Sequence, residues 1–147
     1  MGIFLKNICF ISLYPSNPSP MAKIAHMLIE DLLKTGDFKI SLLTYKEPSM
    51  PISPKIDIYP ILKKDSIKSL VKALLVLRKE KFDIIHMLST RFMHGRMFLL
   101  ITLLVKVLRI KSKFIISAHE FYTFNTLYGF LVGGLYHIFL LRYSDLI

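Results

Sequence analysis

The sequence predicts an α/β domain built on a doubly wound, mostly parallel sheet with helices on both faces. Short apolar runs alternate with longer amphipathic stretches along the chain, which is the pattern that successive βαβ units produce. All seven prolines fall within the first 60 residues, so the remainder is free to form long helices and central strands. A length of 147 residues suits one domain covering residues 1–147.

The first βαβ unit organises the rest of the chain. Residues 7–13 form a mostly apolar run that predicts a buried strand, and a turn rich in proline follows at 14–19. Ser19-Pro20 is a typical helix start, and Gly36 is a typical helix stop. The spacing of the apolar residues predicts that the inner face of this helix holds Met21, Ile24, Ala25, Leu28, Ile29 and Leu32.

The later elements follow in the same order. Strands are predicted at residues 38–44, at 56–59 as a short edge strand, at 82–88 and at 113–118. Helices are predicted from a cap at Asp65 or Ser66 to about residue 80, at 91–109, and at about 122–143. For the second helix the pattern predicts an inner face made of Ile67, Leu70, Val71, Leu74 and Leu75.

The charge balance predicts an anionic partner. The formal net charge is +10, and the mean hydropathy of +0.49 is high for a soluble domain. Residues 61–81 hold seven basic side chains against two acids, and residues 84–119 hold six basic side chains and no acid. A solvated charged face accounts for part of this pattern, and an anionic membrane surface or a phosphorylated ligand accounts for the rest.

Several polar residues are predicted to meet at the carboxyl ends of the strands, where open α/β sheets bind ligands. His86 lies in one predicted strand, Arg91 follows it, and His119 and Glu120 follow the strand at 113–118. A histidine there can bind a phosphate or sugar hydroxyl or act as a general base, although each is also explained as a half-buried structural residue. From the turn, the residues expected to bind substrate are Tyr14, Pro15, Ser16, Asn17 and Ser19.

Other kinds of site are not indicated. Metal ligands lack a short spacing such as HExxH, and the chain has no GxSxG, P-loop or GxGxxG sequence. We therefore expect no bound metal and no bound cofactor. Cys9, the one cysteine, is predicted to be a small buried side chain. Nucleic acid is not an expected partner, because no helix-turn-helix, zinc-finger or RNP-type aromatic pattern is present.

Two apolar stretches raise the alternative of an integral membrane protein. Residues 122–141 carry no charge over twenty residues, and residues 98–108 are also strongly apolar. The first stretch contains Thr123, Asn125, Thr126 and three glycines, which favour a partly exposed core helix over a membrane span.

The ordered set of these features resembles the N-terminal half of GT-B glycosyltransferases, in particular the retaining group 1 (family four) enzymes. The resemblance covers nearly the whole chain and is carried by KNICFISLYPSNPSPMAKIAHMLIEDLLKTGDFKISLLT, FDIIHML, KFIISAHEFY and LLRYSDLI. It implies a Rossmann-like half-domain that binds the acceptor, with His119 as the catalytic residue near the transferred sugar and His86 lining the same cleft. The glycine pair usual in the first loop is replaced by Asn17-Pro18-Ser19, and no donor-binding domain follows.

By this resemblance the chain is the acceptor-binding half of a nucleotide-sugar-dependent hexosyltransferase acting on a lipid-linked or cell-surface glycan. The nucleotide sugar is a co-substrate held mainly by the missing domain or by a separate donor-binding chain, so the chain is expected to be inactive alone. The alternative is a noncatalytic membrane-peripheral or partner-binding module that keeps the fold. Either reading places the protein in the cytoplasm, peripheral to the inner face of the cell membrane.

Overall fold

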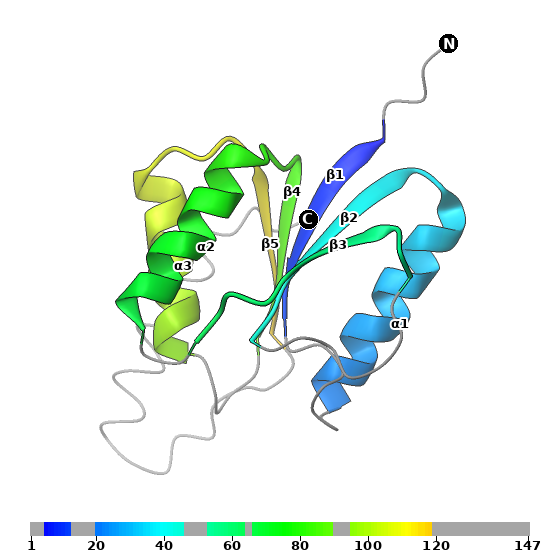
Figure 1. The fold of residues 1–147 in the computed structure, drawn as a ribbon, viewed down its shortest axis with the longest axis horizontal. Coiled ribbons are helices and arrows are strands. Elements are labelled where there is room, and N and C mark those ends of the chain that lie inside the picture. The colour runs from blue at the N-terminus through cyan, green and yellow to red at the C-terminus, as the bar shows by residue number, and fades with distance from the viewer. Residues whose placement is uncertain (1–4, 13–19, 46–52, 64–65, 90–94, 119–147) are drawn as a thin grey trace.

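The computed structural model describes residues 5–12, 20–45, 53–63, 66–89 and 95–118 of the chain. These residues form five strands alternating with three helices (Figure 1). The elements are β1 (Lys6–Ile11), α1 (Pro20–Thr35), β2 (Phe38–Leu43), β3 (Ile56–Tyr59), α2 (Ile67–Lys79), β4 (Ile84–Ser89), α3 (Gly95–Val107) and β5 (Lys113–Ala118).

All five described strands are parallel and lie in the order β3-β2-β1-β4-β5. The chain builds outward from β1 to β3 and then returns to the other side of β1 to add β4 and β5. The strand order therefore reverses between β1 and β4, where Phe10 pairs in register with His86. This arrangement confirms the predicted doubly wound α/β fold.

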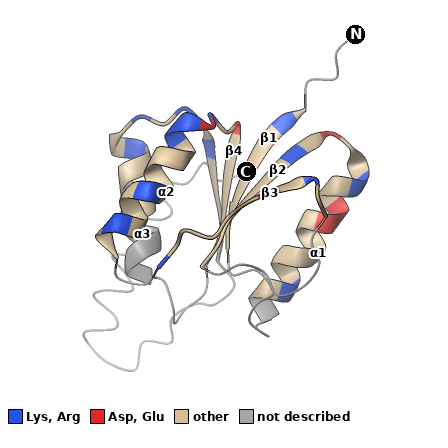
Figure 2. Cartoon of the chain, viewed as in Figure 1, with Lys and Arg blue, Asp and Glu red and all other residues tan. Residues whose placement is uncertain are grey.

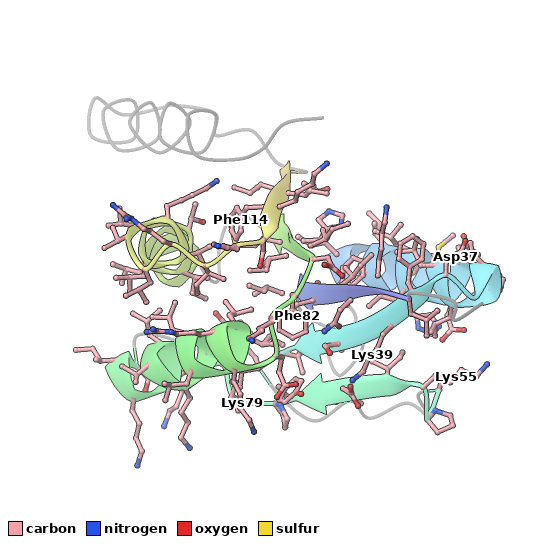
Figure 3. The ribbon with its side chains drawn as sticks, turned by 90° about the horizontal axis from the view of Figure 1, so that it is seen from above. Asp37, Lys39, Lys55, Lys79, Phe82 and Phe114 are labelled. Carbon is pink, nitrogen blue, oxygen red and sulfur yellow. The ribbon has the colours of Figure 1, made fainter. Side chains whose placement is uncertain are left out.

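Helices cover both faces of the sheet (Figure 3). Alternate residues of β1 point to opposite faces, so Phe10 packs with Ala25 and Ile29 of α1. On the other face Cys9 packs into a cluster that includes Leu77 of α2. The predicted two-sided burial of the first strand is thus confirmed, since residues 8–11 are all buried.

Most predicted elements are present with small shifts at their ends. The bounds of β3 and β5 agree with the predicted 56–59 and 113–118. Gly36 follows α1 with a φ of 75°, and its N–H donates to the Leu33 carbonyl, as expected for a glycine that stops a helix. The predicted helix at 122–143 and the prediction of a single domain over 1–147 extend beyond the described residues.

The predicted inner face of α2 is partly wrong. Leu70 and Leu74 are buried, but Ile67 is 80% exposed, Val71 48% and Leu75 61%. The buried side is instead completed by Ser69, Ala73 and Leu77.

Hydrogen bonds of a serine explain the orientation of α2. The Ser69 hydroxyl accepts from the Lys63 N–H and donates to the Ile61 carbonyl, both at 2.7 Å. These bonds satisfy a polar side chain that is 5% exposed. The hydroxyl of Ser66, which is the N-cap, accepts from the Ser69 N–H. The predicted cap at Asp65 or Ser66 is therefore resolved to Ser66.

The inner face of α1 also differs from the predicted one. Ala25 and Ile29 are fully buried and Leu28 and Leu32 are partly buried, as predicted. Ile24 is 38% exposed, and the buried Ala22 takes part in the inner face instead. The small side chains of Ala22 and Ala25 let the helix lie close to the sheet.

Within the described residues, no helix is both long enough and apolar enough to cross a membrane. The apolar stretch at 98–108 belongs mainly to α3, which has 13 residues and buries Ile101 and Val105 in the core. A membrane span at this place is therefore not supported. The stretch at 122–141 lies outside the described residues.

Candidate functional site

His86 is the one predicted site residue that the structure describes. It is the third of six residues in β4 and pairs in register with Phe10 of β1 and Ile115 of β5. Its imidazole lies against the Phe10 ring, with the ring centroids 5.1 Å apart and an interplanar angle of 40°. His86 thus lies within the sheet next to the point where the strand order reverses.

A serine on the neighbouring strand contacts this histidine. The His86 Nε2 and the Ser117 Oγ are 2.8 Å apart, and which atom donates depends on the imidazole tautomer. Ser117 lies two positions beyond Ile115, the register partner of His86, toward the carboxyl edge of the sheet. The pair is half-buried and joins β4 to β5.

Ser117 and Phe10 are not among the site residues predicted from the sequence. Ser117 is the one polar residue within the run FIISA, and in a parallel sheet positions of equal parity on neighbouring strands share a face. The alternation of side chains along a strand places Ser117 on the same face as His86. This inference requires the register of β4 and β5, which the sequence alone does not give.

A serine bonded to a histidine has two chemical readings. It can be a nucleophile with its general base, which in an acyl-transfer site needs a third group to orient the base. It can also hold a hydroxyl or phosphate oxygen of a ligand by hydrogen bonding. The 2.8 Å contact between His86 and Ser117 is compatible with both readings.

The charge distribution distinguishes the two edges of the sheet (Figure 2). Helices that connect parallel strands run antiparallel to them, so the N-termini of α1, α2 and α3 point to the carboxyl edge. None of these helices carries an acidic residue in its first turn. Lys23, Lys63 and Lys68 lie near these N-termini. This edge thus combines helix N-termini with three described lysines, while most of the described basic and acidic residues lie toward the opposite edge.

Acidic residues at the opposite edge have structural partners. The backbone N–H of Asn7 donates to Asp83 Oδ2 at 2.8 Å, and the Asp83 N–H donates to the Asn7 carbonyl at 2.9 Å. The Asp83 carbonyl in turn accepts from the Lys113 N–H. Asp83 therefore aligns the starts of β1, β4 and β5.

Cys9 has no role in chemistry at this site. It is fully buried, and burial raises the pKa of its thiol well above the ordinary value. The thiolate, which is the nucleophilic form, is strongly disfavoured there. The prediction that Cys9 is a small buried side chain is confirmed.

The other predicted site residues lie outside the described residues, so their roles remain predictions. They are Tyr14, Pro15, Ser16, Asn17, Ser19, Arg91, His119 and Glu120. Within the described part of the chain, no group of three or more His, Cys, Asp or Glu side chains is placed to hold a metal ion.

One solved structure similar to this chain is a short-chain dehydrogenase from Leptospira borgpetersenii serovar Hardjo-bovis with bound NAD+. The TM-score is 0.56 and the sequence identity is 13%, over 95% of this chain and 66% of that one. At this identity the likeness establishes a Rossmann-like fold and nothing further. No protein-family model matches the chain, and no curated protein matches it.

These findings overturn the resemblance to GT-B glycosyltransferases. The structural neighbour is a dehydrogenase, so the predicted function as the acceptor-binding half of a glycosyltransferase in glycan biosynthesis is wrong. The features behind the resemblance have local explanations in this fold. Within the run FDIIHML, Asp83 bonds to the start of β1 and His86 packs on Phe10. The nucleotide-sugar co-substrate and the separate donor-binding chain followed from that resemblance and remain untested.

The chain does not fit the usual cradle of a dinucleotide. That cradle needs glycines in the first turn so that the backbone approaches the diphosphate closely. Residues 12–19 read SLYPSNPS and contain no glycine. The residue directly after β2 is Thr44, which is buried and is not a carboxylate that could bind a ribose hydroxyl.

Proposed function

We propose that this chain binds a phosphate-bearing small molecule of the nucleotide class at the carboxyl edge of its sheet. The observation that carries the proposal is the combination at that edge of three helix N-termini, none with an acidic residue in its first turn, and three lysines, Lys23, Lys63 and Lys68. The free N–H groups at a helix N-terminus and the helix dipole, equivalent to roughly half a positive charge, both favour an anion.

The reversal of strand order supports the location. In open α/β sheets, ligands bind outside the carboxyl ends of the strands at such a reversal, which here lies between β1 and β4. His86 and Ser117 lie on β4 and β5 beside it and offer an imidazole and a hydroxyl. We propose that this pair binds a hydroxyl or phosphate oxygen of the ligand.

The neighbour's bound NAD+ indicates one member of the class to test, but the glycine-free first turn favours a ligand held mainly by one phosphate group. A nucleoside monophosphate or diphosphate, whose terminal phosphate needs no close backbone approach along a diphosphate, suits this turn better than a dinucleotide. The proposal therefore concerns ligand binding and makes no assignment of a reaction.

Thermal unfolding with added ligands tests the proposal. A ligand at about 100 times its Kd stabilises the native state by about 2.7 kcal/mol. We expect ADP or AMP to raise the Tm more than adenosine does, with NAD+ below the mononucleotides. His86→Ala and Ser117→Ala should reduce the ADP effect, whereas Met27→Ala on the exposed side of α1 should not. Equal effects of ADP and adenosine, or no effect of any nucleotide, would refute the proposal.

We also propose that the protein associates peripherally with an anionic membrane surface, on the cytoplasmic side. The net charge of +10 supports this location, since each basic residue near such a surface contributes about 1 kcal/mol. The test is sedimentation with vesicles of phosphatidylcholine, with and without phosphatidylserine. Binding that requires phosphatidylserine and decreases with salt is expected, and an equal absence of binding to both vesicles would contradict it.

Lack of binding to nucleic acid stays a prediction.

A further inference from the structure

Helix α2 carries an apolar stripe on its outer side. Ile67, Val71 and Leu75 follow one another at intervals of four residues, which places them in one row along the helix. They are 80%, 48% and 61% exposed. We refer to these three residues as the outer stripe. Large apolar side chains in such a row are unusual on a surface that meets only water.

The residues beside the outer stripe are basic. Lys68 and Lys72 each follow a stripe residue by one position, and Arg78 and Lys79 lie in the last turn. All four are exposed, and α2 contains no acidic residue (Figure 2). The outer side of α2 is thus an apolar row with cations along one flank and at one end.

The inner side of α2 fixes the helix to the domain. Leu70, Leu74 and Leu77 are buried in the core, and the Ser69 hydroxyl bonds to the segment before the helix. The outer stripe therefore cannot turn inward without breaking this packing. It is available to a partner while the fold stays intact.

The charge of α2 selects the kind of partner. A second copy of this chain packed symmetrically on the stripe would bring the cations of two helices together, and the carboxylate of the C-cap Glu80 already contacts Lys79 of its own chain. An anionic lipid bilayer supplies both an apolar phase for the stripe and negative head groups for the lysines, whose long stems let the ammonium groups reach the head-group level.

We infer that the outer stripe of α2 is the surface by which the protein docks on an anionic lipid bilayer, with Lys68 and Lys72 on the lipid head groups. This inference rests on the peripheral membrane location proposed above and assigns it to one face. In the docked state the stripe side chains enter the boundary between head groups and acyl chains, while the rest of α2 stays packed on the sheet.

Tryptophan fluorescence of the full chain tests which face docks. The natural sequence has no tryptophan, so Leu75→Trp and Met27→Trp each give one reporter, on α2 and on the exposed side of α1 respectively. With phosphatidylserine vesicles we expect a blue shift for Leu75→Trp and none for Met27→Trp. The opposite pattern, or no shift in either variant while both bind the vesicles, would overturn the inference and leave peripheral binding itself standing.

Charge variants test the flank of the stripe. Removing one lysine should weaken binding about fivefold, so Lys68→Gln with Lys72→Gln should weaken it roughly 25-fold. The matched control is Lys111→Gln with Lys113→Gln, which removes the same charge from exposed positions before and at the start of β5. Equal losses in both double variants would show that binding follows net charge and would overturn the assignment to α2.

The apolar contribution is tested with Val71→Gln and Leu75→Gln together, which should weaken vesicle binding by about tenfold or more. All replaced side chains are exposed, so the urea unfolding midpoints of these variants should equal that of the wild-type chain. A lowered midpoint would identify a misfolded variant. If the wild-type chain instead forms dimers that the lysine replacements strengthen, the stripe is an interface between copies and the inference is wrong.

Discussion

Asn7 and Asp83 are 76 positions apart in the sequence, yet each donates its backbone N–H to the other residue. The Asn7 N–H reaches the Asp83 carboxylate, and the Asp83 N–H reaches the Asn7 carbonyl. The Asn7 side-chain amide also donates to the Glu80 carbonyl at 3.3 Å. These contacts connect the start of β1 to the end of α2 and the start of β4.

Replacing Asp83 by Ala should lower the free energy of unfolding by about 1 kcal/mol, because a hydrogen bond to a carboxylate is lost at an exposed site. Urea unfolding measures this change. Asp37→Ala is the matched control, since it removes a carboxylate just before β2 and should change stability by less than about 0.5 kcal/mol. Equal losses in the two variants would show that the Asn7 contact contributes nothing.

Ser69→Ala should destabilise the protein more than Ser66→Ala does. The first change leaves the Lys63 N–H and the Ile61 carbonyl without their partner and should lower the free energy of unfolding by about 2 kcal/mol. The second removes only the N-cap bond, for about 1 kcal/mol. The reverse order of the two losses would contradict the explanation given for the orientation of α2.

Phe10→Ala should lower the free energy of unfolding by about 3–5 kcal/mol, since a fully buried aromatic ring is removed from the core. Met27→Ala, at a 56% exposed position, should change it by less than about 0.5 kcal/mol. Because the Phe10 ring contacts His86, the NMR signals of the His86 ring should shift in the Phe10 variant. An unchanged His86 spectrum would argue against this ring contact.

Cys9 should make stability depend on pH at the alkaline end. Burial raises the pKa of its thiol in the folded state above the ordinary value of 9.0. Above that value the unfolded chain releases the proton while the native state keeps it, so the free energy of unfolding falls as pH rises, by at most about 1.4 kcal/mol per pH unit. Urea unfolding between pH 8 and 10, compared with Cys9→Ala, measures this contribution.

Cys9→Ala should have a shallower decrease over this pH range, whatever its absolute stability. The same thiol should react with alkylating reagents only when the protein opens, because the native thiol is buried. Rapid labelling of the folded protein would show that residue 9 is accessible and would refute both expectations.

The element pattern could be predicted because local and long-range preferences agree in most of the chain. Pro54 and Pro60 confine β3 to the residues between them, and the apolar run at 113–118 corresponds to β5. The reversal of direction after β3 could not be read from the sequence. It is fixed by the pairing of β1 with β4, including Phe10 with His86.

The orientation of α2 was missed because apolar residues lie on two sides of this helix, the buried side and the outer stripe. Spacing alone treated Ile67, Val71 and Leu75 as core residues, whereas the buried side holds Ser69 and Ala73. A buried serine is recognisable only when its hydrogen-bond partners are known. Its partners Ile61 and Lys63 lie in the segment before the helix.

The candidate site was predicted less well than the fold. His86 was expected near a strand end, and it lies in the middle of β4 with its ring on Phe10 and its Nε2 near Ser117. Single residues do not reveal such partners, because these depend on strand register. The family resemblance failed for a related reason, since short patterns around strands recur in unrelated Rossmann-like chains.

The shortness of β3 bears on how the protein behaves at high concentration. Within the described residues β3 pairs only with β2, so its outer side exposes backbone groups to which another chain is able to add a strand. Strand β3 is only four residues long, lies between Pro54 and Pro60, and carries the charged residue Asp57. Such an edge is a poor template for intermolecular β-sheet growth, which protects the molecule against fibrillar aggregation.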